Sequence, residues 1–143
     1  MALPEHIHLE IATPEKQVFS GPVDQVTVPS TVGYLGILPG HAPLLGELGI
    51  GEISYKIGDH REYLFCSWGF VEVLPERVII LAQRAENASE IDIKRAEQAR
   101  QRAQSRLTSK DPNTDFVRGQ LAALRAISRL DVARRYQHRQ LPR

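Results

Sequence analysis

The chain has 143 residues, of which 42% are hydrophobic and 24% are charged, as in folded water-soluble proteins. Its single cysteine excludes an intramolecular disulfide and a zinc site built from cysteines, and no apolar run approaches the roughly 18 residues that a membrane-spanning helix needs. The net charge of +1 conceals a division: residues 1–93 carry 5 Lys/Arg and 13 Asp/Glu, whereas residues 94–143 carry 13 Lys/Arg and 4 Asp/Glu. We therefore expect two parts with different partners.

The first half of the sequence predicts short strands. Its opening stretch, MALPEHIHLEI, lacks the basic and apolar regions of a signal peptide and is too acidic for a transit peptide, so we expect a protein that works where it is made. Alternating apolar residues, separated by turn signals such as Gly58-Asp59, then mark the candidate strands. They are HIHLEI (6–11), DQVTVP (24–29), EISYKI (52–57), REYLFCSW (61–68), GFVEV (69–73) and RVIILAQ (77–83). Because no helical period interrupts them, we expect a β-sandwich or barrel and no parallel βαβ sheet.

The pattern changes near residue 88. Residues 89–107 contain no Gly or Pro and favour a helix, with Ser89 and Asp92 resembling a capping box. An Asp-Pro pair at residues 111–112 ends that segment, and a second helix is expected from about Thr114 to Tyr136. Its expected apolar stripe is Val117, Leu121, Leu124, Ile127 and Leu130.

We therefore predict an all-β sandwich domain over residues 1–87, followed by an antiparallel α-helical hairpin over residues 88–143. The apolar stripes of this hairpin are narrow and rich in alanine, which buries little area. We expect the hairpin to be weakly held, so that it can detach from the sandwich or open.

The stretch GYLGILPGHAPLL, residues 33–45, is rich in glycine and proline. It lacks the Gly-Lys-Ser/Thr of a P-loop, and Pro39 and Pro43 remove two backbone donors. His41 has no nucleophile or metal-ligand motif beside it, so a structural or docking role is favoured over catalysis. We expect a rigid turn at one end of the sandwich that presents an apolar face.

This same stretch resembles the signature of the ε subunit of bacterial F-type ATP synthase, which reads G-x-x-G-I-L-P-G-H-A-P-L. The segments SWGFVEVLPERVIILAQRAE and IDIKRAEQARQRA resemble the family's last sandwich strands and first C-terminal helix, in the same order. The resemblance implies a non-catalytic subunit whose sandwich binds the γ subunit of the central stalk and rests on the c-ring. It also implies a movable hairpin that blocks ATP hydrolysis when extended, and whose positive charge meets the acidic loop of the catalytic subunits.

Two residues depart from the family pattern. Tyr34 stands where an acidic residue is common, which puts a charge-based contact with the ring in doubt, and Trp68 replaces a glycine. Trp68 is either a packed core residue or an anchor for the γ subunit. The residues expected at subunit interfaces are Tyr34, Leu35, His41, Ala42, Pro43 and Trp68.

Some relatives bind ATP on the folded hairpin through an I-D-x-x-R-A motif, which this chain matches at residues 91–96. The resemblance implies no required cofactor, but it implies a regulatory ATP site. Its candidate residues are Glu86, Asp92, Arg95, Arg102, Arg125 and Arg129. Their spacing would let arginines of both helices converge on phosphates. The alternative is that Asp92 only caps a helix and that the arginines form a solvated surface.

Two other classes of protein remain as alternatives. The basic C-terminal third suits a nucleic-acid-binding module, but only Phe116 and Tyr136 supply aromatic rings there, so nucleic acid is not the expected partner. A small hydrolase lacks a catalytic set. The resemblance favours a peripheral protein at the cytoplasmic face of a bacterial plasma membrane.

Overall fold

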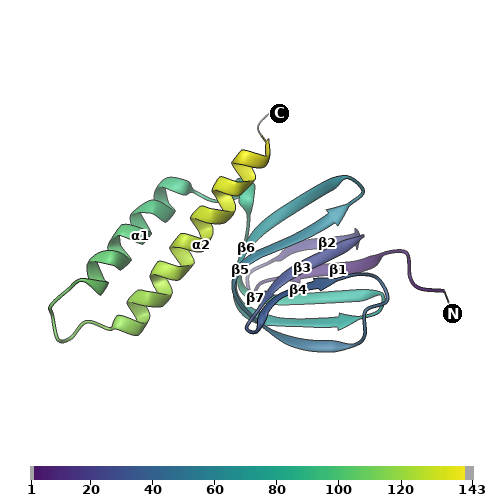
Figure 1. Cartoon of the computed structure of the whole chain (residues 1–143), viewed down its shortest axis with the longest axis horizontal. Coiled ribbons are helices and arrows are strands. Elements are labelled where there is room, and N and C mark those ends of the chain that lie inside the picture. Colours follow the sequence, from purple (N-terminus) through teal and green to yellow (C-terminus); the bar gives the residue numbers. More distant parts are fainter. Residues whose placement is uncertain (1, 141–143) are drawn as a thin grey trace. The chain divides into compact units, whose positions relative to one another are not determined.

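The structure is a computed structural model that describes residues 2–140 of the chain. The chain divides into two compact units, residues 1–87 and residues 88–143. The first unit is made of strands and the second of helices (Figure 1). An all-β domain followed by a helical hairpin is therefore the observed fold, as the sequence predicts.

Seven strands form the first unit as one hydrogen-bonded sheet of order β2-β1-β7-β6-β5-β3-β4. Neighbouring strands are antiparallel, except that β1 and β7, the first and last in the chain, pair in parallel. No helix lies between any two of the seven strands in the described chain, so the sheet contains no parallel βαβ unit, as the sequence predicts. The strands are β1 (Ile7–Ala12), β2 (Gln17–Val23), β3 (Gln25–Ser30), β4 (Gly33–Ile37), β5 (Leu44–Ile57), β6 (His60–Leu74) and β7 (Arg77–Asn87).

Two of these strands, β2 and β4, are absent from the sequence prediction. The strand β4 occupies the first five residues of the stretch that we expected to be a rigid turn, and β5 begins at Leu44, so only residues 38–43 form a loop. The predicted strands at residues 61–68 and 69–73 are one continuous strand, β6.

The strand β6 changes the face that it turns toward the core. Leu64 and Cys66 are buried in the core before the change, and Val71 and Val73 are buried after it, so the buried positions pass from even to odd numbers. This change interrupts the alternation along the strand. The sequence pattern therefore suggests two short strands where the structure has a long one.

The neighbouring long strands change face at the same level. In β5 the buried positions pass from Leu48 to Ile53, and in β7 they pass from Ala82 to Ala85. Gly69 of β6 is paired with Leu48 on one side and with Ala82 on the other. Because the three changes lie side by side, the sheet can bend over itself and enclose the core between its two halves.

The bend depends on an unusual backbone at Trp68 and Gly69. Trp68 has a φ of 57°, the only positive value at a non-glycine residue in the described chain, and Gly69 has a φ of 143°. A Cβ atom at Gly69 would lie 2.0 Å from the carbonyl oxygen of Leu81. Only glycine fits there, whereas Trp68 occupies a conformation that bulky side chains disfavour.

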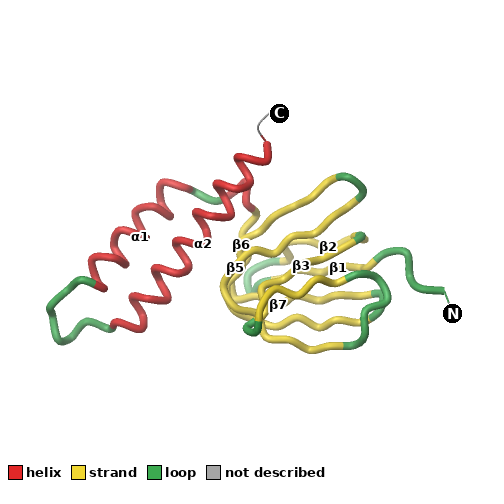
Figure 2. The backbone as a smooth tube through the Cα atoms, viewed as in Figure 1, coloured by secondary structure: helices red, strands yellow, loops and turns green. Residues whose placement is uncertain are grey.

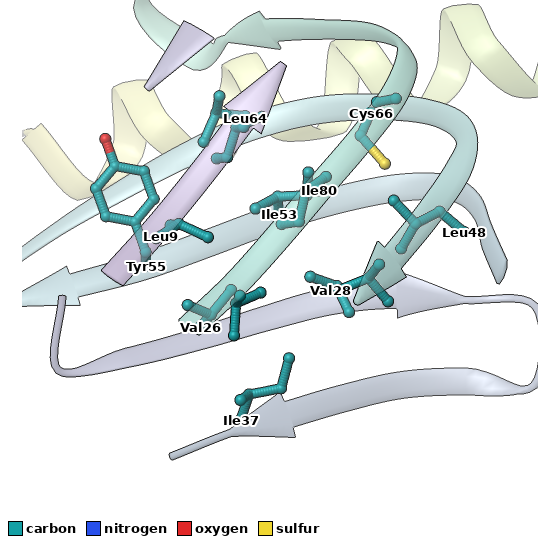
Figure 3. Packing of buried hydrophobic residues seen from close by; sticks show 14 of the residues in the cluster. Leu9, Val26, Val28, Ile37, Leu48, Ile53, Tyr55, Leu64, Cys66 and Ile80 are labelled. Carbon is teal, nitrogen blue, oxygen red and sulfur yellow. The ribbon is translucent and has the colours of Figure 1, made fainter. Parts of the chain in front are cut away.

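The sandwich core consists of aliphatic side chains that point inward from all seven strands (Figure 3). At one edge of it, the rings of Phe19 and Tyr55 stack with their centroids 4.4 Å apart. Cys66 is fully buried, as predicted, and burial raises the pKa of its thiol to about 12. The largest fully buried members are Ile7, Leu9, Ile11, Ile37, Leu48, Ile53, Leu64 and Ile80.

The second unit contains a short 3₁₀ turn (Ala88–Glu90), helix α1 (Ile93–Leu107) and helix α2 (Phe116–Gln140). Helix α1 begins at Ile93 because the carboxylate of Asp92 accepts a hydrogen bond of 3.0 Å from the N–H of Arg95. The predicted capping box that starts at Ser89 is therefore wrong. Asp92 itself is the N-cap, and Ser89 lies in the turn before it.

The two helices pack through small side chains rather than through the predicted stripe. The Val117 and Leu124 side chains are 66% and 50% exposed, whereas Leu130 alone of that stripe is buried. Buried residues instead recur every three or four positions along another face of α2. They are Gly119, Ala123, Ala126, Leu130 and Ala133, opposite Ala96 and Ala103 of α1.

Candidate functional site

Helix α1 presents Arg95 and Arg102 on one side of the hairpin. Ala96 is buried in the seam between the helices, and Arg95 and Glu97 flank it in the sequence. Because successive residues of a helix are turned by about 100°, Arg95 and Glu97 project to opposite sides. Arg102 is seven residues after Arg95 and so shares its side.

An ion pair identifies the matching sides of α2. The guanidinium of Arg134 lies 3.1 Å from the carboxylate of Glu97, so these two residues mark one side of the hairpin. Ala126 is buried in the seam, and Ile127, the next residue, is turned toward one side of the hairpin. Arg134 is seven residues, or two turns, after Ile127 and so lies on that same side. Arg125, which precedes Ala126, therefore projects to the side opposite Arg134.

Arg129 is one turn after Arg125 and lies on the same side of α2. With Glu97 beside Arg134 and Leu107 beside Gly119, residue 102 lies level with the segment between Arg125 and Arg129. Four of the six residues that the sequence predicted for an ATP site therefore lie on one side of the hairpin, but Arg95 is two turns of α1 from Arg102 and lies level with residues near Arg134. These four, which we call the arginine side, are Arg95, Arg102, Arg125 and Arg129.

The other two predicted residues do not belong to the helices themselves. Asp92 is the N-cap of α1, and its carboxylate already accepts the N–H of Arg95. Glu86 is half-buried near the end of β7, in the sandwich unit. Asp92 therefore caps helix α1, as the alternative interpretation of this residue expects.

The opposite side of the hairpin carries an ion-pair network of one carboxylate and two guanidinium groups. Glu97 accepts hydrogen bonds from Arg100 and from Arg134. The hydrogen bond from Arg100, followed by the charges of both arginines, lowers the pKa of Glu97. Glu97 therefore links α1 to α2 on this side, whereas the four side chains of the arginine side are all basic and suit an anion.

The residues expected at interfaces lie around β4 and the loop that follows it. Tyr34 is 63% exposed, and its hydroxyl accepts a hydrogen bond of 3.2 Å from the N–H of Glu52. Leu35 is partly buried against the core instead. The Nδ1 atom of His41 lies 2.7 Å from the carbonyl oxygen of Ala42, which fixes the imidazole within the loop.

Pro43 and Ala42 are exposed at the end of that loop, whereas Trp68 lies at the bend of β6 and not beside them. The indole of Trp68 is partly buried, but it is not among the side chains that pack against the sandwich core. The first of its two predicted roles, that of a packed residue in the sandwich core, is therefore wrong.

A further exposed apolar surface was not predicted. Phe70 of β6 is paired directly with Leu81 of β7, and both side chains are 57% exposed. Leu45 of β5 is a diagonal neighbour of Phe70, since Glu47 pairs with Phe70. We call Leu45, Phe70 and Leu81 the outer patch. The sequence signal that could have predicted this patch is Phe70, a large apolar residue at an outward position of the strand segment GFVEVL.

Among residues 2–140, the structure contains no cluster of three or more His, Cys, Asp or Glu that could hold a metal ion. The helices of this same range are all too short or too polar to span a bilayer. Two of the surfaces that the described residues offer for binding are the arginine side, which suits anions, and the outer patch, which suits an apolar partner.

Two family models match the chain. One, described as ATP synthase, Delta/Epsilon chain, beta-sandwich domain, matches residues 6–88, and the other, described as ATP synthase, Delta/Epsilon chain, long alpha-helix domain, matches residues 89–134. The ATP synthase epsilon chain of Koribacter versatilis is 52% identical over 103 residues, 72% of each chain. That of Syntrophobacter fumaroxidans is 47% identical over 129 residues, 90% of this chain and 96% of the relative.

Among solved structures, a chain of the Euglena gracilis mitochondrial ATP synthase (OSCP/F1/c-ring) is similar with a TM-score of 0.80 and 23% identity. The match covers 90% of this chain and 81% of that chain. At this identity the likeness is one of fold.

Proposed function

This chain belongs to the delta/epsilon family of ATP synthase subunits, and from that premise we propose that it is a non-catalytic part of the rotary central stalk. It joins the γ subunit to the c-ring while protons drive ATP synthesis. The observation that carries the proposal is that the family models match both units in order, with close relatives aligned over almost their whole length. The protein then lies at the cytoplasmic face of a bacterial plasma membrane as a peripheral subunit.

The sandwich offers two surfaces for the two partners. The outer patch, with Phe70 and Leu81 exposed side by side, suits an apolar surface of the γ subunit. The loop at residues 38–43, with the neighbouring Tyr34, suits the c-ring. Tyr34 would make that contact through its ring and hydroxyl rather than through a carboxylate.

The helical hairpin is proposed to inhibit ATP hydrolysis by extending toward the catalytic head. Its seam contains mainly Gly and Ala, so separating the helices exposes little apolar area, at a cost of about 25 cal/mol per Å². Its excess of positive charge suits the acidic loop of the catalytic subunits, and salt would weaken that attraction.

We further propose that ATP binds the arginine side and holds the hairpin folded. Guanidinium groups from both helices fit a triphosphate, because each can donate charge-assisted hydrogen bonds to its oxygens. A ligand that binds only the folded form stabilises it by about 2.7 kcal/mol at a hundred times its dissociation constant. ATP would thus draw the hairpin away from its inhibitory form.

The stalk assignment is tested by purifying the protein from native membranes. Co-purification with the γ subunit and the catalytic head is expected, and Phe70→Asp should weaken it. The complex that lacks residues 89–143 should assemble and hydrolyse ATP faster. A monomeric protein that ignores the γ subunit would refute the assignment, whereas unchanged hydrolysis would refute only the inhibitory role.

The ATP proposal is tested on the isolated full chain by NMR and thermal unfolding with millimolar ATP. Saturable shifts of hairpin amides are expected, and Arg95→Gln should reduce them. Lys94→Gln removes an equal charge from α1 outside the arginine side and should leave them unchanged. Equal loss in both variants, or no response to ATP, would contradict the site.

A further inference from the structure

An open hollow of about 330 Å³ lies next to the turn of the hairpin. The hollow lies beside the loop between Leu107 and Phe116, and Figure 2 shows this loop in green between the two helices. Five residues line it, and we call it the turn hollow: Arg106, Asn113, Thr114, Asp115 and Arg118. None of them belongs to the arginine side.

Hydrogen bonds give the loop a defined shape around the hollow. The N–H of Asn113 donates to the Asp111 carboxylate at 2.9 Å, and the N–H of Thr114 donates to the Asp111 carbonyl at 3.1 Å. The hydroxyl of Thr114 bonds to that of Ser109 at 3.3 Å. These bonds leave the side-chain amide of Asn113 available at the rim.

Close packing of the helices brings the two arginines to the same hollow. A Cβ atom placed at Gly119 would lie 3.7 Å from the Cβ atom of Arg106. Arg118, the residue before Gly119, is turned by about 100° from this contact, and its side chain lines the same hollow as that of Arg106.

The charges that line the turn hollow are not balanced. Within residues 2–140, neither the Arg106 nor the Arg118 guanidinium has a hydrogen-bond or ion-pair partner. The one carboxylate of the lining, that of Asp115, accepts a hydrogen bond of 3.0 Å from the backbone N–H of Arg118 and keeps its charge, so the two arginines and this aspartate leave an excess of one positive charge. Two like charges in one hollow repel each other, and an anion between them converts repulsion into attraction.

We propose that the turn hollow binds a phosphate group, which bridges Arg106 of α1 and Arg118 of α2. Two guanidinium forks match the tetrahedral oxygens of phosphate, and the Asn113 amide supplies a further donor. Such a bridge ties the helices together at the turn. It therefore stabilises the closed hairpin from the end opposite to the start of α1.

The phosphate group has two sources, inorganic phosphate and the phosphates of a nucleotide. The isolated full chain, labelled with ¹⁵N, is titrated separately with sodium phosphate and with ATP at constant ionic strength, and sodium chloride serves as the control salt. Inorganic phosphate should give saturable shifts of amides 113–118, with a dissociation constant on the order of 1 mM. A response to ATP alone would identify the nucleotide as the source.

The double variant Arg106→Gln with Arg118→Gln should weaken this binding by about tenfold or more, because it removes two charged donors. The matched double variant Lys94→Gln with Lys110→Gln loses the same charge outside the hollow and should bind as before. Shifts that grow linearly with salt, or that are equal with chloride, would overturn the proposal, as would equal weakening in both double variants. Loss of the ATP response in Arg95→Gln leaves the turn hollow unaffected, so the two anion sites are tested separately.

Discussion

The bend of the sandwich can be tested by placing a methyl group on Gly69. In Gly69→Ala, the new Cβ atom would lie 2.0 Å from the carbonyl oxygen of Leu81, far inside van der Waals contact. The backbone of β7 would have to move, and Ala82, which pairs with Gly69, would lose its register. A residue other than glycine at a φ of 143° adds about 1–3 kcal/mol of strain. We expect a total loss above about 3 kcal/mol, a large part of the roughly 5–15 kcal/mol that stabilises a typical domain.

Alanine variants at two other glycines distinguish the cost of backbone strain from the cost of the steric clash. Gly58 has a φ of 59°, and no atom lies within 4 Å of the position that a Cβ atom would take there, so Gly58→Ala should cost about 1 kcal/mol from strain alone. Gly36 has open space and no positive φ, so Gly36→Ala should change stability by less than about 1 kcal/mol and in the stabilising direction.

Urea unfolding followed by tryptophan fluorescence measures all three variants, because the single tryptophan, Trp68, lies in the sandwich and reports on that unit. The expected order of stability is Gly36→Ala, then Gly58→Ala, then Gly69→Ala. A loss at Gly69 no larger than that at Gly58 would refute the argument, since the collision would then cost nothing.

Three further outcomes are expected. Arg100 lowers the pKa of Glu97, so the ion pairs of Glu97 should stabilise the fold fully above the ordinary pKa of 4.5 and lose this effect as the pH falls through the lower pKa of the folded state. In an NMR titration of the carboxyl group, Arg100→Gln should raise the midpoint. A midpoint at or above 4.5 in the unchanged protein would contradict the prediction. Tyr34→Phe removes the acceptor for the N–H of Glu52 and should cost about 0.5–1.5 kcal/mol in urea unfolding, near the lower end because water reaches this site; a more stable variant would count against the bond. Cys66, with its pKa raised to about 12, should resist a thiol reagent at pH 8 until urea unfolds the chain, and rapid labelling of the native protein would disagree with its burial.

Alternation in the sequence predicts strands well where one face stays buried throughout. It fails in β6, because the buried face changes at Trp68 and Gly69 and the periodicity is interrupted there. It also fails for β2 and β4, which lie at the two ends of the strand order; β2 carries a glycine and a proline, and β4 carries two glycines. Edge strands bury less of their surface, so they need less of the apolar pattern that a sequence can reveal.

In the helical unit, the sequence pattern predicted the wrong face of α2 as the buried one. Large apolar residues such as Leu124 were expected in the seam, but the buried positions are those of Ala123 and Ala126. Close helix packing favours small side chains, and hydrophobicity alone does not distinguish that face. The spacing of the arginines could be predicted from helical geometry, because it depends on the helices alone. The turn hollow could not, because it depends on the hydrogen bonds of one loop.

The parallel pairing of β1 with β7 has a consequence for how the chain folds. Residues 8–12 meet residues 77–81, so the central part of the sheet is formed by segments that are far apart in the sequence. Closing a loop of that length is entropically costly, which makes this pairing a late and slow step. During synthesis the sandwich cannot be completed until β7 has emerged, whereas the helical hairpin needs only contacts between neighbours in the sequence. We expect truncation within residues 77–87 to prevent folding of the first unit.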